Sequence, residues 1–398
     1  MPPPALCRSV GYGVVRGIVS TFKEKNLNSF FEQHYQEILT ERKYAKISRT
    51  FDTLKETLGE RSLVLYGAGE LGSTVLDICA EKDIQVACIC DRRASGVLGG
   101  VPVISLQTLQ RYFSNATVIV CSFTYNEEII KDLKQLGFGK DRIVPCPIEY
   151  PQYASPKSFQ KHIEGYAWAY DFFEDEVSRQ TILDRLRMYL CETSMNKNTD
   201  CDQYYEYGLI KLGKHEIFVD GGAYNGDSVI SFIEKIKSSN GDYTSIYAFE
   251  PDTENYTQAI ERTSQYSNIE IIPKGLWNKE TVLTFFVNKN AGGHSFVVSG
   301  GGAESRVSVT SLDTIFYGKP DHELPTFIKM DIEGAEKEAL IGTTEIIRRV
   351  KPKMAICAYH KPEDIYELPR TILSIRDDYR FALRHHVCGC YDTVLYVV

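Results

Sequence analysis

The sequence has no long hydrophobic run, no strong excess of one charge and no internal repeat. A helix that spans a bilayer needs about 18 or more apolar residues in a row, so we expect no membrane span. The 53 acidic residues slightly outnumber the 45 basic ones, and the two signs are interspersed. This balance disfavours a nucleic-acid surface as the main partner. With 43% hydrophobic and 25% charged residues, the composition is that of an ordinary globular protein.

The sequence also lacks a good secretion signal and a disulfide framework. Residues 1–15 contain one Arg and a broken apolar stretch, which makes a poor signal peptide. The eleven cysteines are an odd number and most lie inside apolar runs, so we expect reduced thiols in a cytoplasmic protein. Cys88/Cys90 and Cys388/Cys390 are separated by one residue, whereas structural zinc sites usually have two-residue gaps. Alternate residues of a strand share a face, so we assign these pairs to strands and assign no metal ligands.

A chain of 398 residues exceeds what one hydrophobic core usually serves, so two domains are expected. Strand-like and helix-like segments alternate in two separate series, a pattern typical of βαβ units on parallel sheets. Prolines and an aromatic-rich helical stretch separate the two series. The expected organisation is a helical segment at 1–60, a Rossmann-like domain at 61–150, a helical linker at 151–215 and a second α/β domain at 216–398.

The second series ends in a feature that ordinary dinucleotide-binding domains lack. Strands are expected at 217–221, 245–250, 269–274, 282–287, 306–310, 326–331, 354–359, 381–384 and 393–398. The turn between the last two, at 388–392, is too short for a crossover helix, so these strands should pair antiparallel. A parallel sheet that finishes in a hairpin is characteristic of a class I methyltransferase. The fold prediction is therefore α/β, with two Rossmann-like three-layer domains.

Two features of the second series predict a site for an adenosine-containing cofactor. The first is the stretch 219–228, VDGGAYNGDS, where an apolar strand leads into a glycine turn and a helix. Asp220 there either receives the amino group of a methionine moiety or orders the turn. The second is Glu250, at the tip of the next strand, where a carboxylate accepts both ribose hydroxyls. Together they indicate S-adenosylmethionine or NAD, and the terminal hairpin favours the former.

A cluster of acidic residues supplies the predicted catalytic groups. Asp331 and Glu333 lie two residues apart at the end of a strand, within FIKMDIEGAE. Their possible roles are a general base for a hydroxyl, a hydrogen-bonding group for substrate, or ligands of a shared divalent ion. Alternatively, Glu333 caps the helix that follows. His360, at the end of the next strand, is the alternative base, and Lys329 either orients Asp331 or is an ordinary core-edge lysine.

Residues 216–398 resemble the FkbM family of methyltransferases. The matching pieces, in the order of the family, are VDGGAYNGDS, YAFEP, SLDTI, FIKMDIEGAE and AICAYHKPEDI. The resemblance implies O-methylation of a hydroxyl of a sugar, glycan precursor or related natural product, with S-adenosyl-L-methionine as cofactor. It implies cofactor contacts at Asp220, Gly222, Asn225, Gly226 and Glu250. Asp313 matches a recurrent family position, with helix capping as the alternative, and the loop 290–302 is either a lid over the acceptor or a surface loop.

The first series carries a second glycine motif. Gly67, Gly69 and Gly72 form G-x-G-x-x-G between a strand and a helix, and Asp91 follows at the tip of the next strand. The stretch through residue 104 resembles the small domain in front of PglD-type sugar acyltransferases. That resemblance implies binding of a nucleotide or nucleotide-linked sugar, with Arg92 and Arg93 near phosphate. The alternative is a scaffold that serves only to form a homodimer.

Two other functions compete with methyl transfer. An NAD-dependent oxidoreductase or epimerase would use the first glycine motif, but Tyr125 and Lys131 do not have the spacing of a Tyr-x-x-x-Lys dyad. A non-enzymatic nucleotide sensor would keep its ligand affinity after loss of the acidic cluster. Binding of S-adenosylmethionine or of NAD distinguishes the first rival from the methyltransferase.

Overall fold

The computed structural model describes residues 29–149, 153–287 and 303–398. The described residues do not include the loop 290–302, expected to be a lid or a surface loop. They also do not include residues 1–15, which are expected to make a poor signal peptide. The chain divides into two compact units: residues 1–167 with 189–193, and residues 168–188 with 194–398. The expected linker 151–215 therefore contributes to both units.

The first unit is built on a six-stranded sheet in the order β3-β4-β2-β1-β5-β6. All neighbouring strands are parallel except β3, which runs antiparallel to β4. Strands β1 and β5 are buried along their whole length, as expected for central strands covered on both faces. The elements are α1 (Ser29–Arg42), α2 (Lys46–Leu58), β1 (Leu63–Tyr66), α3 (Glu70–Glu81), β2 (Val86–Cys90), β3 (Gly96–Leu98), β4 (Val101–Ile104), α4 (Leu106–Tyr112), β5 (Thr117–Val120), α5 (Asn126–Gln135) and β6 (Ile143–Val144).

Three helices occupy the stretch expected to be a helical, aromatic-rich linker. They are α6 (Pro156–Phe159), α7 (Ile163–Phe172) and α8 (Glu176–Cys191). The break between α7 and α8 is set locally, because the Asp175 carboxylate accepts the backbone N–H of Ser178 and so caps the new helix.

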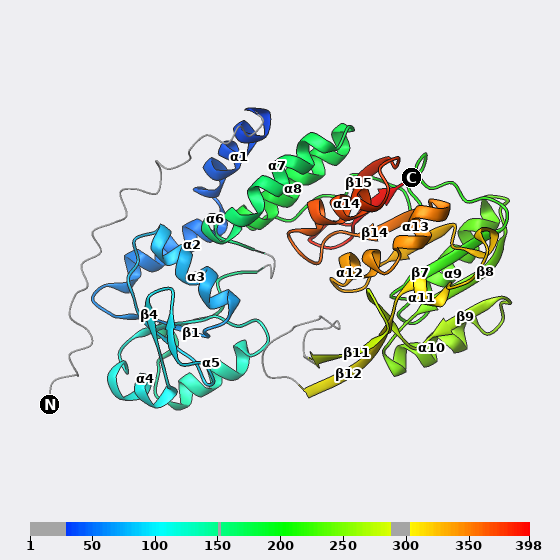
Figure 1. Ribbon diagram of the computed structural model, residues 1–398. Helices are drawn as coiled ribbons and strands as arrows, with labels where there is room; N and C mark the ends of the chain where they lie inside the picture. Colours follow the sequence, from blue (N-terminus) through cyan, green and yellow to red (C-terminus); the bar gives the residue numbers. More distant parts are fainter. Residues whose placement is uncertain (1–28, 150–152, 288–302) are drawn as a thin grey trace. The chain divides into compact units, whose positions relative to one another are not determined.

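The second unit contains a seven-stranded sheet in the order β15-β16-β14-β13-β7-β8-β9. Strands β7, β8, β9, β13 and β14 run parallel, and β16 lies antiparallel between β14 and β15 (Figure 1). The elements are β7 (Glu216–Gly221), α9 (Asp227–Ser238), β8 (Tyr243–Phe249), α10 (Thr253–Thr263), β9 (Ile269–Ile272), β13 (Phe327–Met330), α12 (Glu336–Ile341), α13 (Thr344–Val350), β14 (Lys353–Cys357), α14 (Asp364–Ile375), β15 (Phe381–His385) and β16 (Thr393–Val397). The predicted antiparallel hairpin and the α/β class are confirmed.

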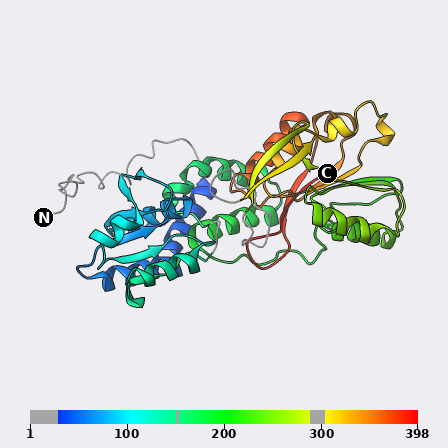
Figure 2. The same ribbon diagram turned by 90° about the horizontal axis from the view of Figure 1, so that it is seen from below.

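Two expected strands of the second series do not join the main sheet. Strand β11 (Thr281–Val287) pairs antiparallel with β12 (Ala303–Thr310), which also pairs with the short β10 (Gly275–Leu276). These three strands form a separate sheet. In Figure 2, β11 and β12 are the yellow-green and yellow strands. Residues 281–284 alternate between half-buried and exposed, the pattern of a sheet with one solvated face. Helix α11 (Leu312–Ile315) leads back to the main sheet.

Right-handed crossovers place the helices of the main sheet on both faces. The strand order moves outward from β7 to β9 and then restarts on the other side of β7 with β13 and β14. Because βαβ crossovers are right-handed, α9 and α10 cover one face and α12 to α14 cover the other. In the core, Phe218 stacks on Phe232 with ring centroids 4.1 Å apart, and Phe327 stacks on Phe218 at 5.2 Å. This aromatic cluster anchors the strands whose ends carry the predicted site.

The described cysteines and helices bear on two expectations from the sequence, which are reduced thiols and the lack of a membrane span. The ten cysteines within the described residues are all free, and most are buried. Within that same part of the chain, none of the helices combines the length and apolar character needed to cross a bilayer.

Candidate functional site

The predicted site residues of the second unit lie at the carboxyl ends of four neighbouring parallel strands. Asp220 and Gly222 end β7, Glu250 follows β8, Asp331 follows β13 and His360 follows β14. The strand order changes direction between β7 and β13. Open α/β sheets bind ligands beside the carboxyl ends of their strands at such a switch point.

The turn after β7 requires glycine at position 222. Gly222 has φ +78°, and a Cβ atom there would lie 1.9 Å from the carbonyl oxygen of Asp331. No side chain fits at that distance, so the glycine lets the turn after β7 approach the end of β13. Tyr224 and Glu333, in the turns after β7 and β13, also have positive φ, of 47° and 56°. Such backbone strain in side-chain-bearing residues is typical of functional sites.

Asp220 is buried beside this turn and pairs with Lys329. The residue is fully buried, its Oδ1 lies 2.9 Å from Lys329 Nζ, and the Ser228 hydroxyl donates to its Oδ2. Lys329 also donates to the carbonyl oxygens of Gly221 and Gly222, at 3.2 and 2.8 Å. Burial by itself lowers the pKa of Lys329, but the neighbouring carboxylates raise it above its ordinary value. These contacts favour the alternative that Asp220 orders the turn, and the cofactor contact at Asp220 stays a prediction.

Glu250 is positioned against the same turn. Its Oε2 accepts the backbone N–H of Tyr224 and its Oε1 accepts that of Asp252, both at 2.9 Å. The side chain is 7% exposed, and a carboxylate oxygen can accept more than one hydrogen bond. Glu250 therefore has a fixed orientation beside the glycine turn, as a residue that binds a diol would need.

The remaining predicted cofactor residues divide into two groups. Asn225 and Gly226 belong to the turn: the Asn225 side-chain oxygen accepts from Arg262, and Gly226 has φ +85° directly before α9. Asp313 has a different role, because its carboxylate accepts the backbone N–H groups of Glu345 and Ile346 at 3.0 and 3.1 Å. Asp313 thus caps α13, which favours the capping alternative, and a cofactor contact at Asp313 stays a prediction. The expected cap of the following helix α11 is instead Ser311.

Asp331 is held by two tyrosine hydroxyls. Tyr204 donates to Oδ2 at 3.0 Å and Tyr359 donates to Oδ1 at 3.2 Å. Burial raises the pKa of both tyrosines, so both remain protonated donors. Burial alone would raise the pKa of Asp331 as well, but Lys329 and His360 lower it below the ordinary value. Asp331 is thus an oriented carboxylate, ionised at neutral pH, with a quarter of its side chain exposed.

His360 lies between carboxylates. Its Nε2 is 3.4 Å from Asp331 Oδ1 and 3.7 Å from Glu333 Oε2, and its Nδ1 is 3.1 Å from Glu336 Oε1. Burial on its own lowers the pKa of His360, but Glu336, Asp331 and Glu333 outweigh it and raise the pKa to about 9. The imidazole is therefore mostly protonated at neutral pH, which weakens it as a proton acceptor. Helix α12 begins at Glu336, with Ala335 at its N-cap position, so Glu333 precedes the helix by three residues.

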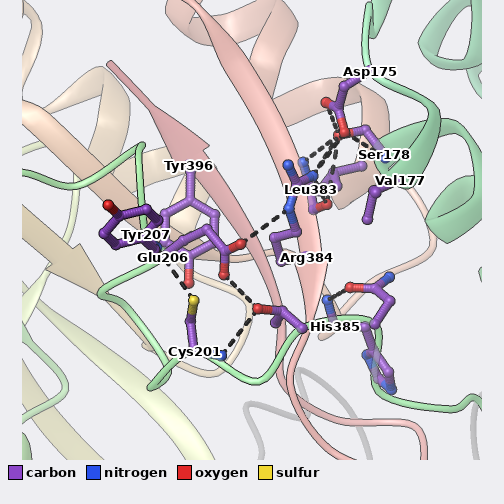
Figure 3. Close-up of polar contacts among 12 residues, drawn as sticks. Asp175, Val177, Ser178, Cys201, Glu206, Tyr207, Leu383, Arg384, His385 and Tyr396 are labelled. Atoms are coloured by element: carbon purple, nitrogen blue, oxygen red, sulfur yellow. Dashed lines mark hydrogen bonds and ion pairs between the residues drawn. The ribbon is translucent and has the colours of Figure 1, made fainter.

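The segment 194–215 has little regular structure but is fastened to the terminal hairpin (Figure 3). Arg384 of β15 pairs with Glu206 at 3.4 Å and with Asp175 at 2.9 Å. The Asn198 side-chain oxygen accepts the backbone N–H of His385, and the Tyr396 hydroxyl accepts that of Tyr204. These contacts fix the backbone of Tyr204 (φ +73°) and so place its hydroxyl on Asp331.

His385, labelled in Figure 3, is buried, and its burial should make the free energy of unfolding depend on pH. Burial lowers the pKa of His385 from 6.5 to about 4, with further lowering by Arg185 and His386. The unfolded chain therefore binds the proton first as the pH falls, so the stabilisation is complete above pH 6.5 and decreases from there toward pH 4. Over this range the free energy of unfolding should decrease by about 3 kcal/mol. Chemical denaturation at pH 7, 5.5 and 4.5 measures this decrease. In His385→Gln the free energy of unfolding should change less steeply with pH than in the unmodified chain. Equal slopes in the two proteins would contradict the role assigned to His385.

Close packing explains two glycines of the motif in the first unit, Gly67 and Gly72. A Cβ atom on Gly72 would lie 2.0 Å from the carbonyl oxygen of Gly67, so helix α3 touches the end of β1. Asp91 uses both carboxylate oxygens on backbone N–H groups, those of Ala68, Arg93 and Ala94, each at 2.8 Å.

Arg92, predicted to lie near phosphate, instead pairs with Glu128 and Asp132. The predicted second nucleotide site at Gly67, Gly69, Gly72 and Asp91 therefore has structural explanations at three of its four residues. These contacts favour the scaffold alternative for the first unit.

A matched pair of glycines tests this explanation. Gly72→Ala should destabilise the first unit by about 2 kcal/mol or more, because the methyl group meets a backbone carbonyl that cannot move cheaply. Gly69→Ala should change stability by less than about 1 kcal/mol, since nothing lies within 4 Å of its added Cβ. Thermal unfolding of both variants measures the difference; equal effects would contradict the packing role.

The sequence interpretation missed three residues of the cluster. Tyr359 ends the expected strand 354–359. Its position at the carboxyl end of a parallel strand is the same signal that identified His360. Glu336 lies within the quoted motif FIKMDIEGAE but reads as a surface residue of a helix. Tyr204 had no sequence signal, because it comes from the irregular segment 194–215 and reaches Asp331 only through the tertiary fold.

The sequence pattern of the Methyltransferase FkbM domain matches residues 220–381. The range includes every predicted catalytic and cofactor residue of the second unit, and the chain is accordingly a methyltransferase. The resemblance of the domain at 61–150 to PglD-type proteins is not confirmed. No curated protein matches the chain significantly.

One solved structure is similar in fold over most of the chain, beyond residues 220–381. The crystal structure of Methyltransferase FkbM from Methylobacillus flagellatus KT has a TM-score of 0.55 at 22% identity, covering 94% of this chain and 99% of that chain. A putative methyltransferase from Streptococcus mutans in complex with SAH has a TM-score of 0.30 at 13% identity, covering 47% and 89%. Aeropyrum pernix fibrillarin with bound S-adenosyl-L-methionine has a TM-score of 0.29 at 13% identity, covering 48% and 70%. The first similarity supports a class I methyltransferase fold.

Proposed function

We propose that the chain uses S-adenosyl-L-methionine to O-methylate a hydroxyl of a sugar, glycan precursor or related small molecule in the cytoplasm. The observation that carries the proposal is the meeting of two groups of residues at one switch point of the sheet. The glycine turn with Glu250 lies on one side, and the oriented carboxylate of Asp331 lies on the other, with Gly222 in van der Waals reach of the Asp331 backbone. A cofactor and an acceptor bound on the two sides would be adjacent.

The residues on the cofactor side fit an adenosine-containing molecule. Glu250 is fixed by two backbone N–H groups and would accept the ribose hydroxyls, while the turn at Gly222–Gly226 leads into the N-terminus of α9. When bound, S-adenosylmethionine supplies a methyl group on a sulfonium, which is already an activated leaving group. The protein therefore mainly has to hold the acceptor oxygen in line and remove water from around it.

Asp331 is the best placed group for the acceptor hydroxyl. It is ionised, and Tyr204 and Tyr359 fix both of its oxygens. His360, with a pKa of about 9, is mostly protonated at neutral pH and serves better as a counter-ion that holds Asp331 in place. Asp331 thus accepts the hydrogen bond of the hydroxyl and aligns its lone pair, and Glu333 lies at the exposed side of the same cluster.

The acceptor class is tested by product analysis. The full chain is incubated with isotopically labelled S-adenosylmethionine and a panel of free sugars, nucleotide sugars and small alcohols and amines, and labelled products are identified by mass spectrometry. A labelled methyl ether on a sugar or nucleotide sugar supports the proposal. Label found only on nitrogen of the amines would replace O-methylation by N-methylation.

A further inference from the structure

Three side chains of the acidic cluster have an arrangement suited to a metal ion. Asp331, Glu336 and His360 each offer one ligand atom, and these three atoms all lie within 4.8 Å of one another. They come from three different elements, since Asp331 follows β13, Glu336 begins α12 and His360 follows β14. Glu336 is fully buried, and the His360 side chain is 9% exposed.

One buried carboxylate oxygen of this cluster lacks a hydrogen-bond partner. Glu336 Oε1 accepts the backbone N–H of Ile332 at 2.9 Å, but no group within the described residues donates a hydrogen bond to Oε2. Neither ring nitrogen of His360 is aligned for a hydrogen bond with these carboxylates, although both lie at ion-pair distance. Leaving a buried carboxylate oxygen without a partner carries a desolvation cost. A ligand that accepts electron pairs would remove that cost.

The surroundings carry an excess of negative charge. Asp364, a further carboxylate near Glu336, is 4% exposed and accepts the backbone N–H of Lys361 at 2.7 Å. Of the basic groups nearby, Lys329 is already paired with Asp220. The ammonium group of Lys361 donates a hydrogen bond to the carbonyl oxygen of Gly334. The carboxylates therefore outnumber the cations that face them, and a further positive charge would be stabilised.

We propose that Asp331, Glu336 and His360 bind a divalent transition-metal ion. Two carboxylates and one imidazole form a mixed oxygen and nitrogen set, which suits Mn²⁺, Fe²⁺ or Zn²⁺ better than Mg²⁺, an ion that prefers oxygen ligands alone. Three protein ligands leave coordination positions open for water or for a substrate, as in catalytic metal sites. The alternative occupant of the cluster is a proton on His360, which would make the imidazolium a bridge between the two carboxylates.

The metal would have a direct use in the reaction, and this part of the inference rests on the proposed function. The open positions lie beside Asp331, where the acceptor hydroxyl is placed. An oxygen bound to a divalent ion loses its proton more readily and is held in a defined direction. Binding of the metal itself does not depend on methyl transfer, so the two claims are tested separately.

The test is a titration of the full chain, treated with EDTA and without S-adenosylmethionine, with Mn²⁺. Electron paramagnetic resonance of the free ion gives the stoichiometry, and calorimetry gives the affinity. We expect one Mn²⁺ per chain, with a tenfold or greater loss of affinity in Glu336→Gln and in His360→Gln. Glu338→Gln is the matched control on the same helix, because Glu338 points to Asn278 and is expected to leave the affinity unchanged.

Two readouts keep the outcome decisive. The His360 side chain is 9% exposed whereas Glu336 is fully buried, so His360→Gln serves if the Glu336→Gln variant does not fold. Pulsed electron paramagnetic resonance should detect nitrogen coupled to the bound Mn²⁺, and this coupling should vanish in His360→Gln. The absence of stoichiometric Mn²⁺ binding, or binding that neither variant weakens, would overturn the metal site and leave the imidazolium bridge. Parallel titrations with Mg²⁺ should show weaker binding; a preference for Mg²⁺ would also count against the proposed ligand set.

Discussion

Replacing Gly222 with alanine is expected to destabilise the second unit by about 3 kcal/mol or more and to abolish cofactor binding. The left-handed backbone, φ +78°, alone costs a side-chain-bearing residue about 1–2 kcal/mol. The steric cost is greater, because the added Cβ would lie 1.9 Å from the carbonyl oxygen of Asp331. Backbone atoms of two adjacent strand ends would have to separate, and this would move both the glycine turn and Asp331. Differential scanning calorimetry measures the stability and isothermal titration calorimetry measures the binding.

Gly318 provides the matched control. Its φ is +75°, almost that of Gly222, but nothing lies within 4 Å of an added Cβ atom. Gly318→Ala should therefore show the cost of the backbone conformation alone and leave binding intact. If the two variants lose the same amount of stability, the close approach of β7 and β13 does not have the role assigned to it.

Asp331→Asn is expected to reduce the rate of methyl transfer by about 10²–10⁴-fold, the range typical of a positioned acid–base group. The amide keeps an acceptor for one tyrosine hydroxyl but removes the negative charge that faces Lys329 and His360. The acceptor hydroxyl then loses its hydrogen-bond acceptor, while Glu250 and the glycine turn are unchanged. The effect should thus appear in kcat measured with the acceptor found by product analysis, with little change in the affinity for S-adenosylmethionine.

Glu333→Gln separates the two predicted catalytic carboxylates. Glu333 is exposed and lies 3.7 Å from His360, so its loss should reduce kcat by less than about tenfold. A larger effect from Glu333→Gln than from Asp331→Asn would exchange their roles. Equal, small effects in both would remove the acidic cluster from the chemical step.

The fold was largely predictable because its signals are local. Buried strands such as β7 and β13 are short apolar runs, and the turn at 388–392 is too short for anything but an antiparallel connection. The separate sheet of β10, β11 and β12 was not predicted, because periodicity identifies a strand but not the strand with which it pairs. The glycine turn was located correctly because Gly222 and Gly226 are required by backbone conformation, which sequence records directly.

The partners of the site residues were less predictable, since they depend on tertiary contacts. Asp220 and Asp313 match the expected motif, yet one is buried on Lys329 and the other caps a helix that begins about 30 residues later in the chain. Tyr204 reaches Asp331 from an irregular segment whose position is set by Arg384 and the terminal hairpin (Figure 3). The protonation of His360 likewise follows from three carboxylates within residues 331–336, which only the fold brings beside the end of β14, so a lone histidine in the sequence could not reveal it.

Calorimetric titration of the full chain with S-adenosylmethionine, with NAD in parallel, decides which unit holds the cofactor. We expect micromolar binding of S-adenosylmethionine that Glu250→Gln weakens strongly and that Asp91→Asn leaves unchanged, together with no binding of NAD. Binding of NAD without binding of S-adenosylmethionine, lost in Asp91→Asn, would contradict the assignment of the site to the glycine turn and Glu250 and would move it to the first unit.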